Sequence, residues 1–64
     1  MKIDRDKINL AMARKGYTIA RLAEAYGAST QRMRTILNSV KVSPVTAGRL
    51  AKALGVDVTE IIED

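Results

Sequence analysis

Residues 28–43 combine hydrogen-bonding side chains with cations and contain no acidic residue. The cations are Arg32, Arg34 and Lys41, and the hydrogen-bonding side chains are Thr30, Gln31, Thr35 and Asn38. Glutamine pairs with adenine edges, threonine offers a hydroxyl and a methyl group, and arginine binds guanine or phosphate. The chemistry expected of this segment is therefore recognition of a polyanion such as duplex DNA. An exposed face that merely lacks Asp and Glu would have the same composition.

The charge of the chain is distributed unevenly around its net value of +4. Residues 14–52 hold eight basic side chains against a single acid, Glu24, whereas residues 53–64 hold four acids and no base. Each Lys or Arg placed near a phosphate releases condensed counterions, so the basic middle favours a polyanionic partner. A basic surface that serves only solubility remains the alternative explanation.

Composition excludes several classes of function. The chain has no Cys and no His, so we expect no disulfide, no soft-metal site and no cofactor. Its carboxylates stand mostly at helix caps or in the tail, and no Gly-rich phosphate loop follows a strand, which argues against an enzyme. No apolar run approaches the roughly 20 residues that span a bilayer, so we expect a cytoplasmic protein without a membrane contact. At 64 residues, the chain should form one domain, residues 1–64, with a small core.

Capping residues and apolar stripes predict an all-α fold of five helices. The predicted N-caps are Asp4, Thr18, Ser29, Ser43 and Asp57, and Ser43 is followed by a proline suited to the first helical position. The predicted ends are Gly16, Gly27, the pair Asn38–Ser39, and Gly55. Asp57 and Glu60 have the spacing of a capping box at the start of a short fifth helix.

The buried face of each predicted helix follows from the spacing of its apolar residues. The expected core positions are Ile8, Ala11, Met12, Leu22, Ala23, Tyr26, Met33, Ile36, Leu37, Ala47, Leu50, Ala51, Leu54, Val58, Ile61 and Ile62. Leu10 lies off the stripe of the first helix, so we expect it to contact the fifth helix or a second subunit. Gly48 lies inside the fourth helix, where glycine costs about 1 kcal/mol relative to alanine, so we expect it to pack closely against another backbone.

The second and third predicted helices are short and are joined by Gly27-Ala28-Ser29, which is the length and turn of a helix-turn-helix. At about 100° per residue, Gln31, Thr35 and Asn38 lie within about 40° of the direction opposite Met33. Arg32 and Arg34 lie about 100° to either side of Met33. The outward face of the third helix is therefore neutral at its centre and flanked by cations.

The sequence resembles the Cro/CI-type, lambda-repressor-like family of helix-turn-helix DNA-binding domains. The resemblance extends from about Ile8 to Ile62 and rests on the stretches GYTIARLAEAYGAS, ILNSVKVS and AGRLAKALGVDVTEII. It implies a compact five-helix bundle. In this bundle the start of the second helix and the loop after the third bind phosphates, and the start of the third helix contacts bases.

The resemblance also assigns roles to individual positions. The residues matching base-contacting positions are Thr30, Gln31, Arg34 and Thr35, and those matching phosphate-contacting positions are Thr18, Asn38 and Lys41. Arg32 is a further phosphate candidate because of its charge and direction. Tyr17 and Tyr26 match core or core-edge positions.

The chain departs from the family pattern at three places. Ile19 stands where the family usually has a phosphate-binding Gln, so only its backbone N–H is available there. Met12 and Leu37 stand where many members pair an Arg with a Glu, and an apolar pair avoids the desolvation cost of a buried ion pair. Ser39 replaces the usual Gly after the third helix, so the loop backbone is expected to differ.

Two hypotheses for function follow. The first is a small transcriptional regulator that binds double-stranded DNA sequence-specifically, as a homodimer on two half-sites, through a third helix spanning about residues 29–38. The second is an antitoxin-like or regulatory module that docks a protein partner through the acidic fifth helix, and exposure of both Ile61 and Ile62 in the monomer would support it.

Overall fold

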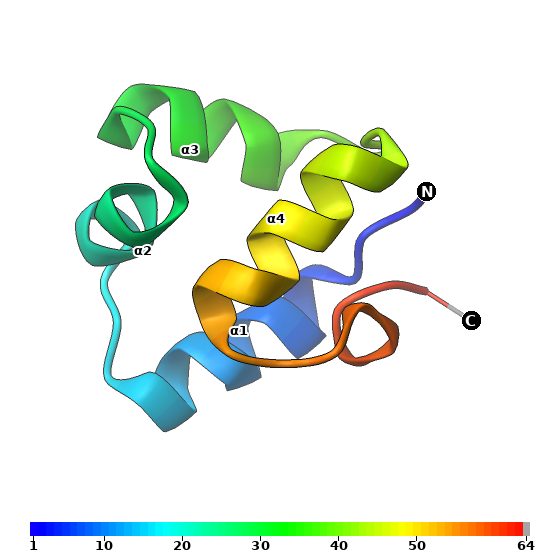
Figure 1. Cartoon of the computed structure of the whole chain (residues 1–64), viewed down its shortest axis with the longest axis horizontal. Coiled ribbons are helices and arrows are strands. Elements are labelled where there is room, and N and C mark those ends of the chain that lie inside the picture. Colours follow the sequence, from blue (N-terminus) through cyan, green and yellow to red (C-terminus); the bar gives the residue numbers. More distant parts are fainter. Residues whose placement is uncertain (64) are drawn as a thin grey trace.

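The helices begin at the capping residues expected from the sequence. The computed structural model describes residues 1–63, and its four α-helices are α1 (Arg5–Lys15), α2 (Ile19–Tyr26), α3 (Thr30–Asn38) and α4 (Pro44–Leu54) (Figure 1). In each case the side chain before the helix accepts a hydrogen bond from a backbone N–H of the first turn. These N-cap residues are Asp4, Thr18, Ser29 and Ser43. Each cap satisfies N–H groups that have no partner inside the helix.

The turn between α2 and α3 depends on the left-handed backbone of Gly27, which has a φ of 93°. Residues with a Cβ adopt this conformation only at a cost, so glycine is the natural residue here. Ser39, at the end of α3, has instead a φ of −75° and a ψ of 135°, which any residue adopts. Its hydroxyl donates a hydrogen bond to the Thr35 carbonyl oxygen at 2.9 Å. This geometry explains why serine can replace the usual glycine at the end of α3.

The expectation of five helices is wrong, because the chain after Gly55 forms a single 3-10 turn, η1 (Val58–Glu60). The predicted capping box of Asp57 and Glu60 is present. The backbone then leaves the helical path, and the Ile61 carbonyl oxygen accepts a hydrogen bond from the Asp4 N–H at 2.8 Å. The peptide groups that would continue a fifth helix therefore pair with the N-terminal segment instead.

The N-terminal segment, residues 1–3, lies between two other parts of the backbone. Lys2 forms an antiparallel bridge with Lys41 in the α3–α4 loop, and Ile3 forms one with Ile62. In Figure 1 the N-terminus lies beside the start of α4, and the η1 segment lies below it on the same side of the molecule. The sequence provided no indication of this pairing.

One hydrophobic core joins all the elements of the described residues, with α4 in contact with α1, α2 and η1. The buried side chains are Ile3, Ile8, Ala11, Met12, Leu22, Ala23, Met33, Ile36, Leu37, Ala47, Leu50, Ala51, Leu54 and Ile61. Met12 and Leu37 are thus both core residues, in agreement with an apolar replacement of the ion pair. Tyr17 and Tyr26 are half-buried against the core, as expected.

Several expectations about packing need correction. Val58 and Ile62 are only partly buried, whereas Ile3, which was not expected in the core, is 8% exposed. Gly48 is exposed, and a Cβ built on it would meet no atom within 4 Å, so close backbone packing does not explain this glycine. Leu10 is 54% exposed and, with Val56 and Glu60, lines an apolar hollow between α1 and the η1 region.

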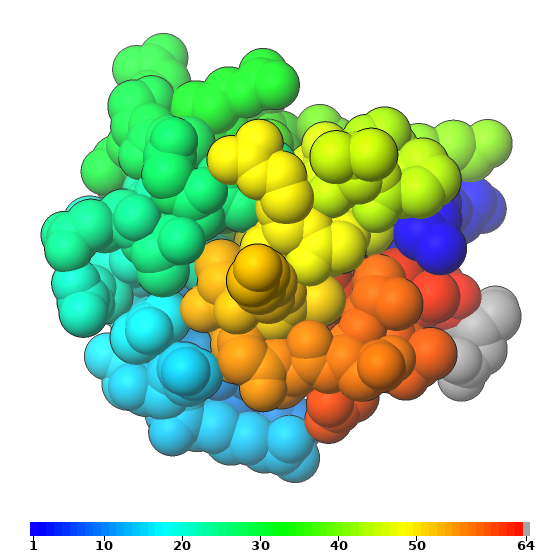
Figure 2. Space-filling model, in the orientation of Figure 1, coloured from blue at the N-terminus to red at the C-terminus, as the bar shows by residue number. Residues whose placement is uncertain are grey.

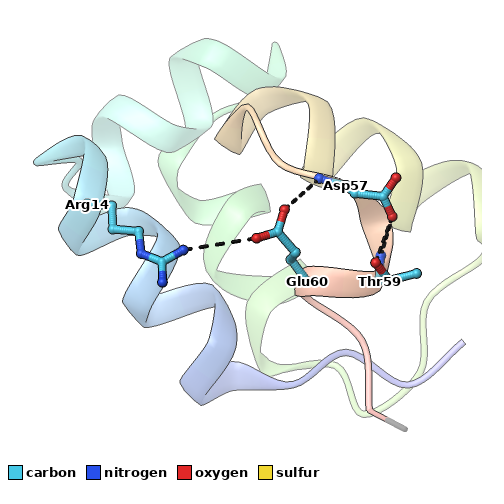
Figure 3. A network of polar contacts seen from close by, with 4 residues as sticks. All are labelled: Arg14, Asp57, Thr59 and Glu60. Atoms are coloured by element: carbon cyan, nitrogen blue, oxygen red, sulfur yellow. Dashed lines mark hydrogen bonds and ion pairs between the residues drawn. The ribbon is translucent and has the colours of Figure 1, made fainter.

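A polar network ties η1 to the end of α1 (Figure 3). Arg14 and Glu60 form an ion pair at 4.0 Å, and the other carboxylate oxygen of Glu60 accepts from the Asp57 N–H at 3.1 Å. The Asp57 carboxylate accepts from the backbone N–H and the hydroxyl of Thr59 at 2.9 and 2.8 Å. These bonds, the backbone one first, hold the pKa of Asp57 below its ordinary value.

Candidate nucleic-acid interface

Helices α2 and α3 are held together by their inward faces, which leaves the opposite face of α3 open. Leu22 and Ala23 of α2 and Met33, Ile36 and Leu37 of α3 are buried in the common core. In the view of Figure 2, α2 and α3 form the left and upper edges of the molecule, and α4 lies in the centre. The first helix of the pair therefore supports the second without covering its outer face.

The hydrogen-bonding side chains expected on the outward face of α3 are exposed there, except at its first residue. Gln31 and Thr35 are exposed, whereas Thr30 is half-buried beside the N-cap. The Thr35 hydroxyl donates to the Gln31 carbonyl oxygen at 3.1 Å, so its proton is engaged within the helix. Thr35 thus offers a methyl group and an acceptor lone pair, whereas Gln31 keeps a free amide that both donates and accepts.

The two arginines of α3 are exposed and have no acidic neighbour. Arg32 and Arg34 make no side-chain hydrogen bond or ion pair with any residue from 1 to 63. Arg21, by contrast, is paired with Glu24 on α2. The guanidinium groups flanking α3 are therefore available to an external anion.

The first residue of α2 is Ile19, so the start of this helix offers a phosphate no side-chain donor at that position. The Thr18 side chain caps α2 by accepting from the Arg21 N–H at 3.1 Å, which leaves its hydroxyl proton free to donate. Ile19 is half-buried and packs against the core, so its side chain serves the fold. Thr18 and the unpaired first-turn N–H groups remain as the donors at this end.

Two cations that the sequence did not single out lie at the other end of α3. Asn38 and Lys41 are exposed there, as expected. The bridge between Lys2 and Lys41 adds Lys2 to this group. Arg5, the first residue of α1, donates from Nη1 to the Leu37 carbonyl oxygen at 3.3 Å and to Asn38 Oδ1 at 3.4 Å. The sequence did not indicate Lys2 and Arg5 because the N-terminal segment brings them to α3, and its pairing leaves no periodic pattern.

The residues named as candidates fall into three groups along the chain. Thr18 is at the start of α2, the residues Thr30, Gln31, Arg32, Arg34 and Thr35 are on α3, and Asn38 and Lys41 follow at its end.

Two other features of the described residues bear on function. Within residues 1–63, no helix has the length and apolarity required to cross a membrane. Within the same range, no three or more side chains of His, Cys, Asp or Glu are grouped so that they could hold a metal ion.

Comparison with known proteins gives a family and one structural relative. A family model described as Cro/C1-type HTH DNA-binding domain matches residues 7–64. No curated protein matches the sequence. A solved structure of a hydroxyethylphosphonate dioxygenase variant is similar over 100% of this chain, with a TM-score of 0.79 and 31% sequence identity. The matched region is 14% of that dioxygenase chain, so the similarity concerns a small part of it.

Proposed function

The chain belongs to the Cro/C1-type helix-turn-helix DNA-binding domain family, and we propose that it binds duplex DNA sequence-specifically, with α3 in the major groove, to regulate transcription. The observation that carries this proposal is the outward face of α3. Gln31 and Thr35 are exposed at its centre, and Arg32 and Arg34 flank it without acidic partners.

The bases are contacted by Thr30, Gln31, Arg34 and Thr35. Gln31 can donate to and accept from one adenine edge, and Arg34 can donate two hydrogen bonds to guanine. The Thr35 methyl suits a thymine methyl, because the hydroxyl proton is already bound to the Gln31 carbonyl oxygen. Thr30 contributes only at the edge, since it is half-buried.

The phosphates are contacted on both sides of α3. Thr18 and the first N–H groups of α2 bind one strand, and Asn38 and Lys41 bind at the far end of α3. Arg32 adds a cation from the flank of the helix. Lys2, which lies opposite Lys41 in the backbone bridge, joins this far group.

One copy of α3 contacts too few bases to select one genomic site, because each bidentate contact discriminates by only about 1–3 kcal/mol. We therefore propose that two copies act as a homodimer on a paired site, in the cytoplasm, where the DNA of a regulated gene would be reached. A palindrome with half-sites about one helical turn apart is the expected consequence.

We propose no catalytic role for this chain, although its structural relative is a dioxygenase. The common non-haem iron site uses two histidines and a carboxylate, and these 64 residues contain no histidine. The similarity is therefore attributed to a shared helix-turn-helix unit.

Docking of a protein partner through the C-terminal region is not favoured. Exposure of both Ile61 and Ile62 on the monomer would have supported that hypothesis. Ile61 is fully buried, and Ile62 is half-buried and held by the bridge to Ile3. Removing Ile61 from the core to bind a partner would expose a side chain that stabilises the monomer by about 1.5–3 kcal/mol.

Selection of bound duplexes from a randomised pool tests the proposal directly. The expected result is an enriched, paired motif, and loss of its enrichment when Gln31 or Arg34 is replaced by alanine. No binding at low salt, or binding that does not depend on Gln31 and Arg34, would contradict it.

A further inference from the structure

Arg5 is a cation at the N-terminus of its own helix, α1, but its side chain reaches the C-terminus of α3. It is the first residue of α1, where the helix dipole favours acids, as at Asp6 in the same turn. Its guanidinium extends to the C-terminus of α3, where the dipole favours cations, and Nη1 lies 3.3 Å from the Leu37 carbonyl oxygen. Its position therefore favours a role in holding α3.

The contact between Arg5 and Asn38 fixes the orientation of the Asn38 amide. Arginine has donors and no acceptor, so the Asn38 atom that faces it must be the oxygen, Oδ1, at 3.4 Å from Nη1. The amide nitrogen of Asn38 is then on the opposite side of the group. Asn38 is exposed, and its amide nitrogen has no hydrogen-bond partner within residues 1–63.

We propose that Arg5 is a positioning residue for DNA binding, which orients the Asn38 amide so that its N–H groups donate to a phosphate of the duplex. This inference rests on the proposed function. Arg5 lies outside residues 7–64, which the family model matches, so the family match does not include the contact between Arg5 and Asn38. The Arg5 side chain connects α1 to the Leu37 carbonyl oxygen. The Leu37 side chain is apolar and buried, so it cannot form the ion pair that is common in the family.

Arg5 acts through Asn38 and does not itself bind the phosphate. Nε and Nη1 already face three acceptors, since Nε also donates to Asn9 Oδ1 at 3.2 Å, and only the Nη2 donors have no partner within residues 1–63. Arg5 and Asn38 both line a surface hollow that also contains Asp4, Asp6 and Glu63, and these carboxylates disfavour a phosphate inside it. The Asn38 amide nitrogen, which faces away from Arg5, is therefore the group presented to the DNA.

A double-mutant cycle tests this coupling. The affinity for a duplex recovered from the randomised pool is measured at several salt concentrations for the unmodified chain, R5M, N38A and the double variant. R14M is the matched control, because it removes the same charge from the other end of α1. Thermal melting followed by circular dichroism establishes that each variant is folded at the assay temperature.

We expect each single variant to lose roughly tenfold in affinity, as for a hydrogen bond to a charged group, and the double variant to lose no more than N38A. The slope of log affinity against log salt should be the same for R5M as for the unmodified chain, since an amide releases no counterion. R14M should bind as the unmodified chain does.

Other results overturn the inference. Independent losses that multiply in the double variant would show that Arg5 does not act through Asn38. A slope reduced by about one in R5M would show that Arg5 contacts a phosphate itself. If the unmodified chain binds no duplex, the proposed function fails, whereas binding with unaffected R5M affinity removes only the role of Arg5.

Discussion

The guanidinium carbon of Arg49 lies 4.4 Å from the ring centroid of Tyr26, and Nη2 of the same residue donates a hydrogen bond to the Tyr26 carbonyl oxygen at 3.2 Å. Tyr26 is the last residue of α2, directly before the turn glycine Gly27. Arg49 comes from α4, so one side chain ties the central helix to the end of the first helix of the pair. The turn is therefore held by a contact from a distant element as well as by its glycine.

Replacing Arg49 by methionine is expected to lower the free energy of unfolding by about 1 kcal/mol, from the lost cation–π contact and hydrogen bond at an exposed site. The midpoint of urea denaturation measures the loss. Arg49→Lys should recover only part of it, because an ammonium cannot stack on the ring and reach the carbonyl oxygen together. Full recovery by lysine would mean that charge alone matters at this position.

Gly48 provides a test of helix propensity without a packing contribution. It lies inside α4, is exposed and has open space where a Cβ would stand. Gly48→Ala should therefore stabilise the protein by about 0.5–1 kcal/mol. Gly16 is the matched control, since a Cβ there also meets nothing within 4 Å but its φ is 68°. Gly16→Ala should destabilise by about 1–2 kcal/mol, and equal effects of the two changes in thermal melts would contradict this explanation.

The main features of the fold could be predicted because they depend on local signals. Helix caps and apolar stripes act within one helix, so they can be recognised from neighbouring residues in the sequence. Examples are the caps Thr18 and Ser43 and the apolar residues Leu50 and Leu54. The fifth helix was predicted wrongly because the Ile61 carbonyl oxygen accepts its hydrogen bond from a group distant in sequence, the N–H of Asp4. A capping box indicates where a helix begins, and tertiary hydrogen bonds decide how far it continues.

The exposed face of α3 could be predicted in the same way. The outward direction of Gln31 and Thr35 follows from helical geometry alone. The positions of Lys2 and Arg5 near the end of α3 depend on backbone pairing across roughly forty residues and on a hydrogen bond across thirty-two, and neither leaves a local pattern. The close packing expected of Gly48 was wrong because a costly residue type does not by itself imply a neighbour.

Asp57 should make stability depend on pH in the acidic range. Its folded-state pKa lies below the ordinary value of 3.8, first because of the Thr59 backbone N–H and then its hydroxyl. The stabilisation is thus complete above the ordinary pKa and is lost as the pH falls through the lowered one. Urea midpoints of the unmodified chain and D57N should differ less at pH 2 than at pH 6. The variant T59V keeps the backbone bond, so it should retain most of the pH dependence.

Base contacts and phosphate contacts should be separable by mutation on α3. Gln31→Ala should cost about 1–3 kcal/mol in binding to the selected duplex and relax the preference at one base pair. Arg32→Ala should weaken binding to all duplexes alike and lower the salt slope by about one. Affinities for the selected duplex and a scrambled duplex, each over a range of salt, give both quantities. If Arg32→Ala changed the preferred sequence, it would have to be counted among the base contacts.

Lys2 and Lys41 should have opposite effects on folding and on binding. They are directly paired in an antiparallel bridge, where like charges destabilise by about 0.2–1 kcal/mol, and a phosphate between them would remove that repulsion. Lys2→Gln should therefore raise the urea midpoint of the free protein, yet lower its affinity for DNA and reduce the salt slope by about one. Lys52→Gln removes the same charge from α4, beside Tyr26 and Arg49, and should change neither quantity by as much. An unchanged slope in K2Q would place Lys2 away from the phosphates, because a lysine that neutralises a phosphate must release its counterion.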